Sequence, residues 1–286
     1  MSSAPEARVR ALRAADTSAA LELLAARPVQ NVLLEHVVAA GALGRLQGFF
    51  GCEIEGALQG ILMVGALGGA SLEVRDPRAF APLAEWAAGL ATPPRHLSGP
   101  EDVTAPFFSV YAKHAVCDLL WERRERVYVV ERGAVQPGEI TAIRRASEAE
   151  IESIAEHSAR QHLEDLKEDR RALDPGGFRA RHLTEIREGH WWVAECSGRI
   201  CFQVHVGPRS HAVVQLGGVF TPPDLRGRGC ATRALRALVA RLHADRPRVS
   251  LLCDESNHVA CRLYERVGFR VVAHNHSYLL RGGRYA

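Results

Sequence analysis

The feature that most constrains this chain is a segment rich in glycine and arginine, between an apolar run and an amphipathic pattern. The apolar run AVVQLGGVF, residues 212–220, ends at Pro222 and Pro223. Residues 226–231 then read RGRGCA, and the segment after them repeats leucine and valine at helical spacing with arginines on the other side. This order predicts a strand, a tight loop and the N-terminus of a helix.

The predicted loop is suited to an anion. The first N–H groups of a helix have no partner within the helix, and the helix dipole places partial positive charge there. Gly227 and Gly229 let the backbone approach a phosphate closely. Arg226, Arg228 and Arg233 add fixed charge. No Gly-Lys-Ser/Thr follows the glycines, and the spacing is not G-x-G-x-x-G, so the two common nucleotide loops are excluded.

A second pattern follows this loop and helix. The run RVSLLC, residues 248–253, predicts a strand, and residues 254–257 contain capping residues for a helix that Gly268 ends. The helical segment reads NxxAxxLYExxGF from Asn257 onward. Asn257 and Tyr264 are about two helical turns apart, so they are expected on one helix face.

Together, the order R-x-x-G-x-A behind a strand and a proline turn, and the later N-x-x-A-x-x-L-Y pattern, resemble the two signatures of the GNAT acetyltransferase superfamily. The resemblance covers residues 140–286. It implies a mixed, mostly antiparallel α/β (α+β) sheet flanked by helices, with acetyl-CoA (coenzyme A) as the cofactor and its pyrophosphate in the loop. The run GVFTPP further resembles a two-part branch of this superfamily, in which a degenerate half precedes the GNAT domain.

The first part of the chain is expected to be a second, smaller α/β domain. Its predicted elements follow in the order two helices, a hairpin with its turn at Glu55 and Gly56, strand, helix, strand, helix, strand, which repeats the order of the second part. At residues 74–77, where an anion loop should come, the sequence VRDP has no glycine. We therefore expect a degenerate GNAT-like domain at residues 1–138 and a GNAT domain at residues 139–286. An unrelated α/β domain is the alternative for the first part.

Within the second part, residues 140–144 predict the first strand, and Ser147 with Glu150 forms a capping box for a long helix. The charged segment after this helix is expected to break at residues 174–177, before a helix over residues 178–188. Residues 191–195 and 200–206 predict a hairpin.

The resemblance also implies which residues hold the cofactor. Backbone groups of Val219, Phe220 and Thr221 should pair with the pantetheine arm. The Val219 N–H should polarise the thioester carbonyl, as a fixed donor aimed at developing negative charge. Glycines at residues 217 and 218 fit a bulge at this point. The other expected cofactor-binding residues are Arg226, Gly227, Arg228, Gly229, Cys230, Ala231, Asn257 and Tyr264.

Tyr264 is also the expected catalytic acid, because its hydroxyl can protonate the departing thiolate at neutral pH. A tyrosine that only packs in the core is the alternative. The base is left unassigned: Gln215 cannot act as one, and a water chain is a further possibility. The candidates are Glu164, Glu168, His162, His205 and His211.

These features predict an acetyl-CoA-dependent N-acyltransferase that moves an acetyl group to an amine by direct attack in a ternary complex. The acceptor, a small molecule or a peptide, is left open. One alternative is a non-catalytic acyl-CoA-binding or sensor protein. Another is a regulatory module that binds a different nucleotide. Consumption of the thioester in the presence of amines distinguishes the enzyme from the first alternative, and failure of CoA to stabilise the fold would indicate the second.

Composition bears on the binding partners and the cellular compartment of the protein. A net charge of +3 is too small to indicate nucleic acid or membrane binding. The seven cysteines show no C-x-x-C and no metal-site spacing, so no metal is expected, and free thiols indicate a reducing compartment. No signal peptide is recognisable at the start, and no apolar run is long enough for a membrane span. A cytoplasmic monomer or homodimer is expected.

Overall fold

A computed structural model of the 286-residue chain describes residues 7–46, 48–167 and 169–281. These residues divide into two compact units. The first unit contains the described residues of 7–127, 252–257 and 271–281, and the second contains those of 128–251 and 258–270. The division into domains at residues 1–138 and 139–286 stays a prediction. Residues 271–281 therefore belong to the same unit as residues 7–127.

The sheet of the first unit is mostly antiparallel. Neighbouring strands pair antiparallel except β4 and β5, which are parallel. The turn between β2 and β3 uses Glu55 and Gly56, both at positive φ, as the hairpin prediction requires. In sheet order, the strands are β1 (Arg8–Ala11), β2 (Phe49–Ile54), β3 (Ala57–Val64), β4 (Gly69–Val74), β5 (His96–Pro100) and β12 (Arg270–Arg281).

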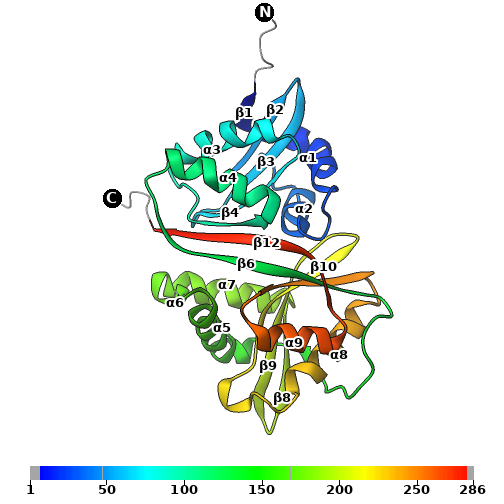
Figure 1. Ribbon diagram of the computed structural model, residues 1–286. Coiled ribbons are helices and arrows are strands. Elements are labelled where there is room, and N and C mark those ends of the chain that lie inside the picture. Colours follow the sequence, from blue (N-terminus) through cyan, green and yellow to red (C-terminus); the bar gives the residue numbers. More distant parts are fainter. Residues whose placement is uncertain (1–6, 47, 168, 282–286) are drawn as a thin grey trace, which may run out of the picture. The chain divides into compact units, whose positions relative to one another are not determined.

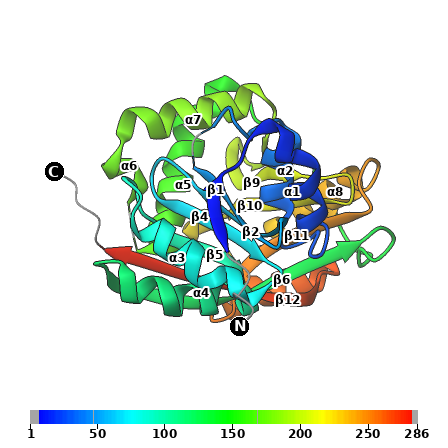
Figure 2. The same cartoon turned by 90° about the horizontal axis from the view of Figure 1, so that it is seen from above.

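Helices cover both faces of this sheet (Figure 2). On one face lie α1 (Thr17–Leu24) and α2 (Val32–Ala39), and on the other α3 (Phe80–Ala88) and α4 (Glu101–His114). Successive residues of a strand point to opposite faces, so Ile61 of β3 is buried with α1 and α2, whereas Leu62 is buried with α3 and α4. One strand thus contributes to two cores.

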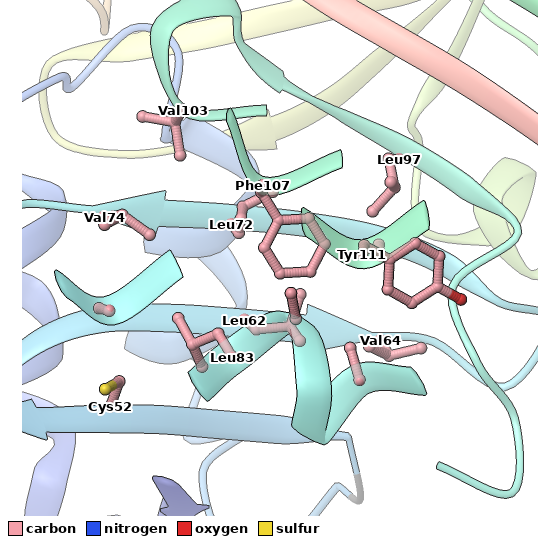
Figure 3. Packing of buried hydrophobic residues seen from close by; sticks show 14 of the residues in the cluster. Cys52, Leu62, Val64, Leu72, Val74, Leu83, Leu97, Val103, Phe107 and Tyr111 are labelled. Atoms are coloured by element: carbon pink, nitrogen blue, oxygen red, sulfur yellow. The ribbon is translucent and has the colours of Figure 1, made fainter. Parts of the chain in front are cut away.

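The larger core contains side chains from the last strand of the chain. The rings of Phe107 and Tyr111 of α4 stack on each other with centroids 5.8 Å apart. Both lie close to buried side chains of the sheet (Figure 3). Tyr278 and Leu280 of β12 are buried in the same cluster, and the ring of Tyr278 stacks on Phe108 with centroids 4.0 Å apart. β12 therefore completes the hydrophobic core of the first unit.

The second unit repeats this pattern of pairing. β7–β8, β8–β9 and β9–β10 are antiparallel, and β10 and β11 are parallel. The strands are β7 (Arg144–Arg145), β8 (Trp191–Cys196), β9 (Arg199–Arg209), β10 (Val213–Phe220) and β11 (Arg248–Asp254). The long strand β6 (Asp118–Glu131) is labelled in Figure 1. Its residues 118–127 belong to the first unit and its residues 128–131 to the second. The expected mixed, mostly antiparallel α/β fold is confirmed.

The helices of the second unit cover the strands that carry the predicted loop. Ser147 and Glu150 form the predicted capping box before α5, with the Ser147 N–H donating to the Glu150 carboxylate at 2.7 Å. α5 and α7 bury Ile154 and Ile186 against Trp191 of β8. The helices are α5 (Ile151–Leu166), α6 (Arg170–Leu173), α7 (Pro175–Arg187), α8 (Cys230–Leu242) and α9 (His258–Val267).

Two local predictions were wrong. The strand expected over residues 140–144 is reduced to β7, because residues 140–143 lie beside α8 and bury Ile143 there. The helix expected over residues 178–188 begins at Pro175 instead. The Asp174 carboxylate accepts the Gly177 N–H at 2.9 Å, and proline fits the first turn of a helix. The predicted break is therefore a capped helix start, and α6, just before it, was not predicted.

Candidate functional site

The glycine- and arginine-rich loop joins β10 to α8 through a short 3-10 helix, Pro223–Leu225. Gly227 and Gly229 both adopt left-handed backbone conformations, with φ of 76° and 74°. Gly229 is the N-cap residue of α8 and has no side chain to satisfy the first N–H groups of the helix. A Cβ placed on Gly227 would meet no atom within 4 Å. The loop therefore presents open backbone at Gly227 and an electropositive helix start at Gly229, where a Cβ would lie 2.8 Å from Arg233 Nη1.

The arginines of the loop make specific contacts. Arg226 donates to both carboxylate oxygens of Glu164, at 3.0 and 2.9 Å, and its Nε donates to the Thr221 carbonyl at 2.9 Å. Arg228 donates to the Asp224 carbonyl at 3.1 Å, and the Arg228 carbonyl in turn accepts from a further arginine of α8. These bonds hold the loop in shape while the guanidinium groups stay partly exposed. Glu164 is accordingly committed to the loop.

A β-bulge in β10 lies just before the loop. Gly217 faces His205 of β9, but Phe220 faces Gln203, so β10 has one residue more than β9 over this stretch. Gly218 lies in the bulge at φ 58°, and a Cβ there would approach the Trp191 ring at 2.8 Å. The bulge expected at the paired glycines is confirmed. It takes the backbone of Val219 out of regular pairing with β9.

The end of β10 is anchored to α5. The buried Gln203 side chain contacts His157 Nδ1 at 3.0 Å and donates to Ser158 Oγ at 3.3 Å. The His157 ring lies 5.2 Å from the ring of Phe220, and the Arg226 guanidinium lies over the same phenyl ring at 5.4 Å. Phe220 is therefore fixed between α5 and the loop.

A polar cavity of about 240 Å³ opens beside the bulge. Residues from α5, α7, β8, β9 and β10 all contribute to its wall, so it exists only in the assembled second unit. Its lining residues are Ser158, Gln161, His162, Arg181, His182, Glu185, Trp191, His205 and Gly218.

Glu185 and His205 form the acidic and basic pair of this cavity. Glu185 Oε2 accepts a hydrogen bond from Trp191 Nε1 at 2.9 Å and lies 3.9 Å from His205 Nε2. That nitrogen is buried and has no hydrogen-bond partner among the described residues. Burial lowers the pKa of His205 to about 4, so the imidazole is neutral at pH 7. The neutral ring and the carboxylate both face the space beside Gly218.

His182 is a second neutral imidazole in the wall. Its Nδ1 donates to the Phe178 carbonyl at 2.8 Å, which leaves Nε2 as the acceptor of the neutral ring. Burial lowers the pKa of His182 as well. The ring stacks on Trp191 with centroids 5.4 Å apart. Trp191, the first residue of the predicted hairpin, is therefore both a core residue and part of the cavity wall.

The structure groups the predicted site residues unequally. Those of the loop and of the end of β10 lie together in the second unit: Val219, Phe220, Thr221, Arg226, Gly227, Arg228, Gly229, Cys230 and Ala231. Tyr264 of α9 is in this unit too, buried against the rings of Tyr128 and Phe269. Asn257 belongs to the first unit, where its N–H donates to the Asp254 carbonyl.

The candidate bases separate as clearly. His162 and His205 line the cavity, whereas Glu164 pairs with Arg226. His211 is exposed at the far end of β10, and Glu168 lies outside the described residues. Sequence reasoning missed Glu185. The signal for it was the spacing of His182 and Glu185, one helical turn apart on the face of α7 that also buries Phe178 and Ile186.

No helix in the part of the chain that the structure describes has both the length and the apolarity to cross a membrane. Within residues 7–46, 48–167 and 169–281, no three acidic, histidine or cysteine side chains are grouped as metal ligands.

Solved structures with similar folds cover nearly the whole chain. An acetyltransferase of the GNAT family from Colwellia psychrerythraea matches 96% of this chain and 100% of its own, at TM-score 0.63 and 9% identity. A GCN5-related N-acetyltransferase from Sphaerobacter thermophilus matches 99% and 98%, at TM-score 0.62 and 18% identity. A tandem GNAT protein from the clavulanic acid biosynthesis pathway matches 98% and 100%, at TM-score 0.59 and 15% identity.

Sequence comparison agrees with these folds. No curated protein matched the chain. The model of the acetyltransferase (GNAT) family matches residues 151–269, a segment that contains α5, the cavity wall, the bulge, the loop and Tyr264. The chain therefore has the two-part GNAT fold, and its residues 151–269 are an acetyltransferase (GNAT) family domain.

Proposed function

We propose that the protein is an acetyl-CoA-dependent N-acyltransferase that transfers an acetyl group to an amine by direct attack. The observation that carries the proposal is the place of the bulge in β10. The loop follows the strand directly, and the polar cavity opens beside Gly218 of the same strand. One strand thus connects the residues proposed to hold the donor with the residues proposed to hold the acceptor.

The loop fits the pyrophosphate of coenzyme A. The N–H groups of Cys230 and Ala231 begin α8 behind a glycine N-cap, and the space over Gly227 is open. Arg228 and Arg233 add positive charge at this helix start, where an anion is favoured. Arg226 braces the loop through Glu164, a contact that a phosphate group can compete for because both side chains are half exposed.

Four groups share the chemistry. Acetyl-CoA, when bound, supplies an acetyl group activated as a thioester. The Val219 N–H donates to the carbonyl oxygen of that group, and the Tyr264 hydroxyl gives its proton to the departing sulfur. The new C–N bond forms as the C–S bond breaks, and the amine nitrogen loses a proton. In the cavity, the Glu185 carboxylate accepts that proton, and the neutral His205 ring lies 3.9 Å from it.

Calorimetric titration with acetyl-CoA is the test of the donor site. Wild-type protein is expected to bind acetyl-CoA, and a folded Arg226→Glu, Gly229→Glu variant is expected to lose binding. Thioester consumption with a library of amines then tests the transfer. Binding without consumption would favour the acyl-CoA-binding or sensor alternative, and absence of binding by the wild-type protein would overturn the proposal.

Tyr264→Phe tests the proposed acid. Turnover is expected to fall about 100-fold, the scale of general acid catalysis, while the affinity for acetyl-CoA is unchanged. Tyr128→Phe is the matched control, since it removes a neighbouring hydroxyl that donates to Glu265 at 2.9 Å. Equal turnover by the wild-type and Tyr264→Phe proteins would assign Tyr264 to packing alone.

A further inference from the structure

The wall of the cavity contains one acidic and one basic side chain besides three imidazoles. Burial lowers the pKa of both His182 and His205, so these imidazoles contribute no positive charge. The third imidazole is that of His162, the acidic side chain is Glu185 and the basic one is Arg181. A ligand that complements this wall has one cationic and one anionic group.

Glu185 and Arg181 are held apart although they are four residues apart on α7. Arginine and glutamate at this spacing usually attract one another across a helix face. Here the Glu185 carboxylate is directed to Trp191 and His205, and the Arg181 guanidinium lies over the Phe178 ring at 5.5 Å. Each charge is therefore available to a ligand in the cavity.

Arg181 also differs from the other arginines of its helix. Arg179 forms an ion pair with Glu152 at 2.8 Å, and Arg187 forms one with Glu148 at 2.9 Å. Among the described residues, Arg181 makes neither an ion pair nor a hydrogen bond. An exposed guanidinium at the wall of a polar cavity, without a carboxylate of the protein, is suited to a carboxylate or phosphate of a ligand.

The two charges differ in depth. Glu185 and His205 lie next to the bulge, because Trp191 contacts both Glu185 and the space over Gly218. The Arg181 side chain is exposed, so it marks the outer part of the cavity. The cationic nitrogen of a ligand is thereby drawn toward β10, where the proposed acyl donor would lie, and its anionic group toward solvent.

The cavity has enough space for a small ligand. About 240 Å³, the volume of roughly eight water molecules, accommodates a small metabolite. We infer that the acceptor is a small zwitterionic amine, of the amino acid type, whose ammonium group is bound by Glu185 and His205 and whose anionic group is bound by Arg181. This inference rests on the proposed function and names the substrate class of the same site.

Matched pairs of amines test the inference. The probes are the protein amino acids, β-alanine and 4-aminobutyrate, each compared with its carboxamide, at saturating acetyl-CoA. For the best acceptor, kcat/KM of the acid is expected to exceed that of the amide at least tenfold. Arg181→Gln should reduce this preference to less than threefold, by raising KM for the acid only. Arg179→Gln, which changes the paired arginine of the same helix, should keep the full preference.

A binding measurement separates the two levels of the proposal. The best acid is titrated directly into wild-type, Arg181→Gln, Arg179→Gln and Glu185→Gln proteins by calorimetry. Tenfold or greater loss of affinity is expected for the Arg181 and Glu185 variants only. Binding of acetyl-CoA with no preference for acids, with a preference that survives Arg181→Gln, or with transfer to peptides alone would overturn the inference and leave the donor site standing. Failure to bind acetyl-CoA would overturn the proposed function instead.

Discussion

Both units contain a junction of strand, 3-10 helix and α-helix, but a carboxylate caps this junction in the first unit and glycines leave it uncapped in the second. In each unit a strand that pairs in parallel with its sequential neighbour leads through a 3-10 helix toward a helix of the same place in the order. In the first unit the Asp76 carboxylate accepts the Arg78 N–H at 2.9 Å and an Arg78 guanidinium hydrogen bond at 2.8 Å. In the second unit Gly227 and Gly229 occupy the junction, and Gly229 offers no side-chain cap.

The difference shows what a repeated fold does not determine. A carboxylate at the start of a helix satisfies the same N–H groups and the same dipole that a phosphate would. The hydrogen bond from the Arg78 guanidinium holds the pKa of Asp76 below its usual range, so the first junction contains a carboxylate of the protein where a ligand's phosphate would bind. Strand order gives the location of a possible ligand site, but the residues at the junction decide whether a ligand is bound.

The largest test converts the second junction into the first. Gly229→Asp adds a carboxylate at the N-cap of α8, and aspartate tolerates the left-handed conformation better than most residues. Loss of hydrogen bonds to the pyrophosphate and repulsion of its charge should weaken acetyl-CoA binding roughly 1,000-fold, measured by calorimetry. Gly198→Asp, at φ 73° in a hairpin turn with open space around it, is the control. A Kd within tenfold of wild type would break the comparison.

The second test asks whether the buried His205 of the cavity makes the second unit less stable at acid pH. The folded-state pKa of His205 is about 4, below the value of 6.5 for a free imidazole, chiefly because of burial, with Glu185 opposing and the neighbouring His190, His182 and Arg209 adding to the shift. Between pH 6.5 and 4 the unfolded chain therefore binds a proton at His205 that the folded chain does not bind. The contribution of neutral His205 to the free energy of unfolding is full above pH 6.5 and is lost as the pH falls toward 4.

His205→Gln removes this proton linkage. Between pH 7 and pH 4 the wild-type protein should lose roughly 2 kcal/mol more stability than the variant, a value reduced from the full shift because the side chain is 22% exposed. Chemical denaturation across this pH range is the measurement. His211→Gln, at an exposed position, should follow the wild-type curve. Parallel curves for wild type and His205→Gln would show that the imidazole titrates normally.

The smallest effect is expected from opening the first junction. Asp76→Ala removes the cap of the 3-10 helix and should lower Tm by about 2 °C. It should not create a second acetyl-CoA site, because no glycine lets the backbone approach a phosphate there. The stoichiometry of acetyl-CoA binding is the measurement, with Asp118→Ala as a surface control. A rise from one to two molecules per chain would mean that the capping carboxylate alone excludes the ligand.

Local patterns explain what the sequence predicted well. The turn at Glu55 and Gly56, the capping box at Ser147 and the bulge at Gly218 each depend on a few neighbouring residues with distinctive conformational preferences. The junction loop is equally local, since its glycines and arginines are consecutive. Such features can be recognised before any tertiary contact is known.

The cavity could not be predicted in this way. Glu185, Trp191 and His205 come from a helix and two strands, and only their packing brings the carboxylate, indole and imidazole together. The ion pair of Arg226 with Glu164, a residue that does not line the cavity, likewise joins residues far apart in sequence. The place of β12 in the first unit was also missed, because alternation within a strand does not identify the strand's neighbours.

The burial of β12 in the first unit has a consequence for how the protein is made. The N-terminal end of a chain emerges from the ribosome first, and domains generally fold as they emerge. Here Tyr278 and Leu280, among the last described residues, belong to the core formed by α3, α4 and the early strands. The early part of the first unit therefore has β5 paired only with β4 until β12 has been synthesised. A nascent or prematurely terminated chain would expose that edge, and such chains are the expected clients of chaperones and proteases.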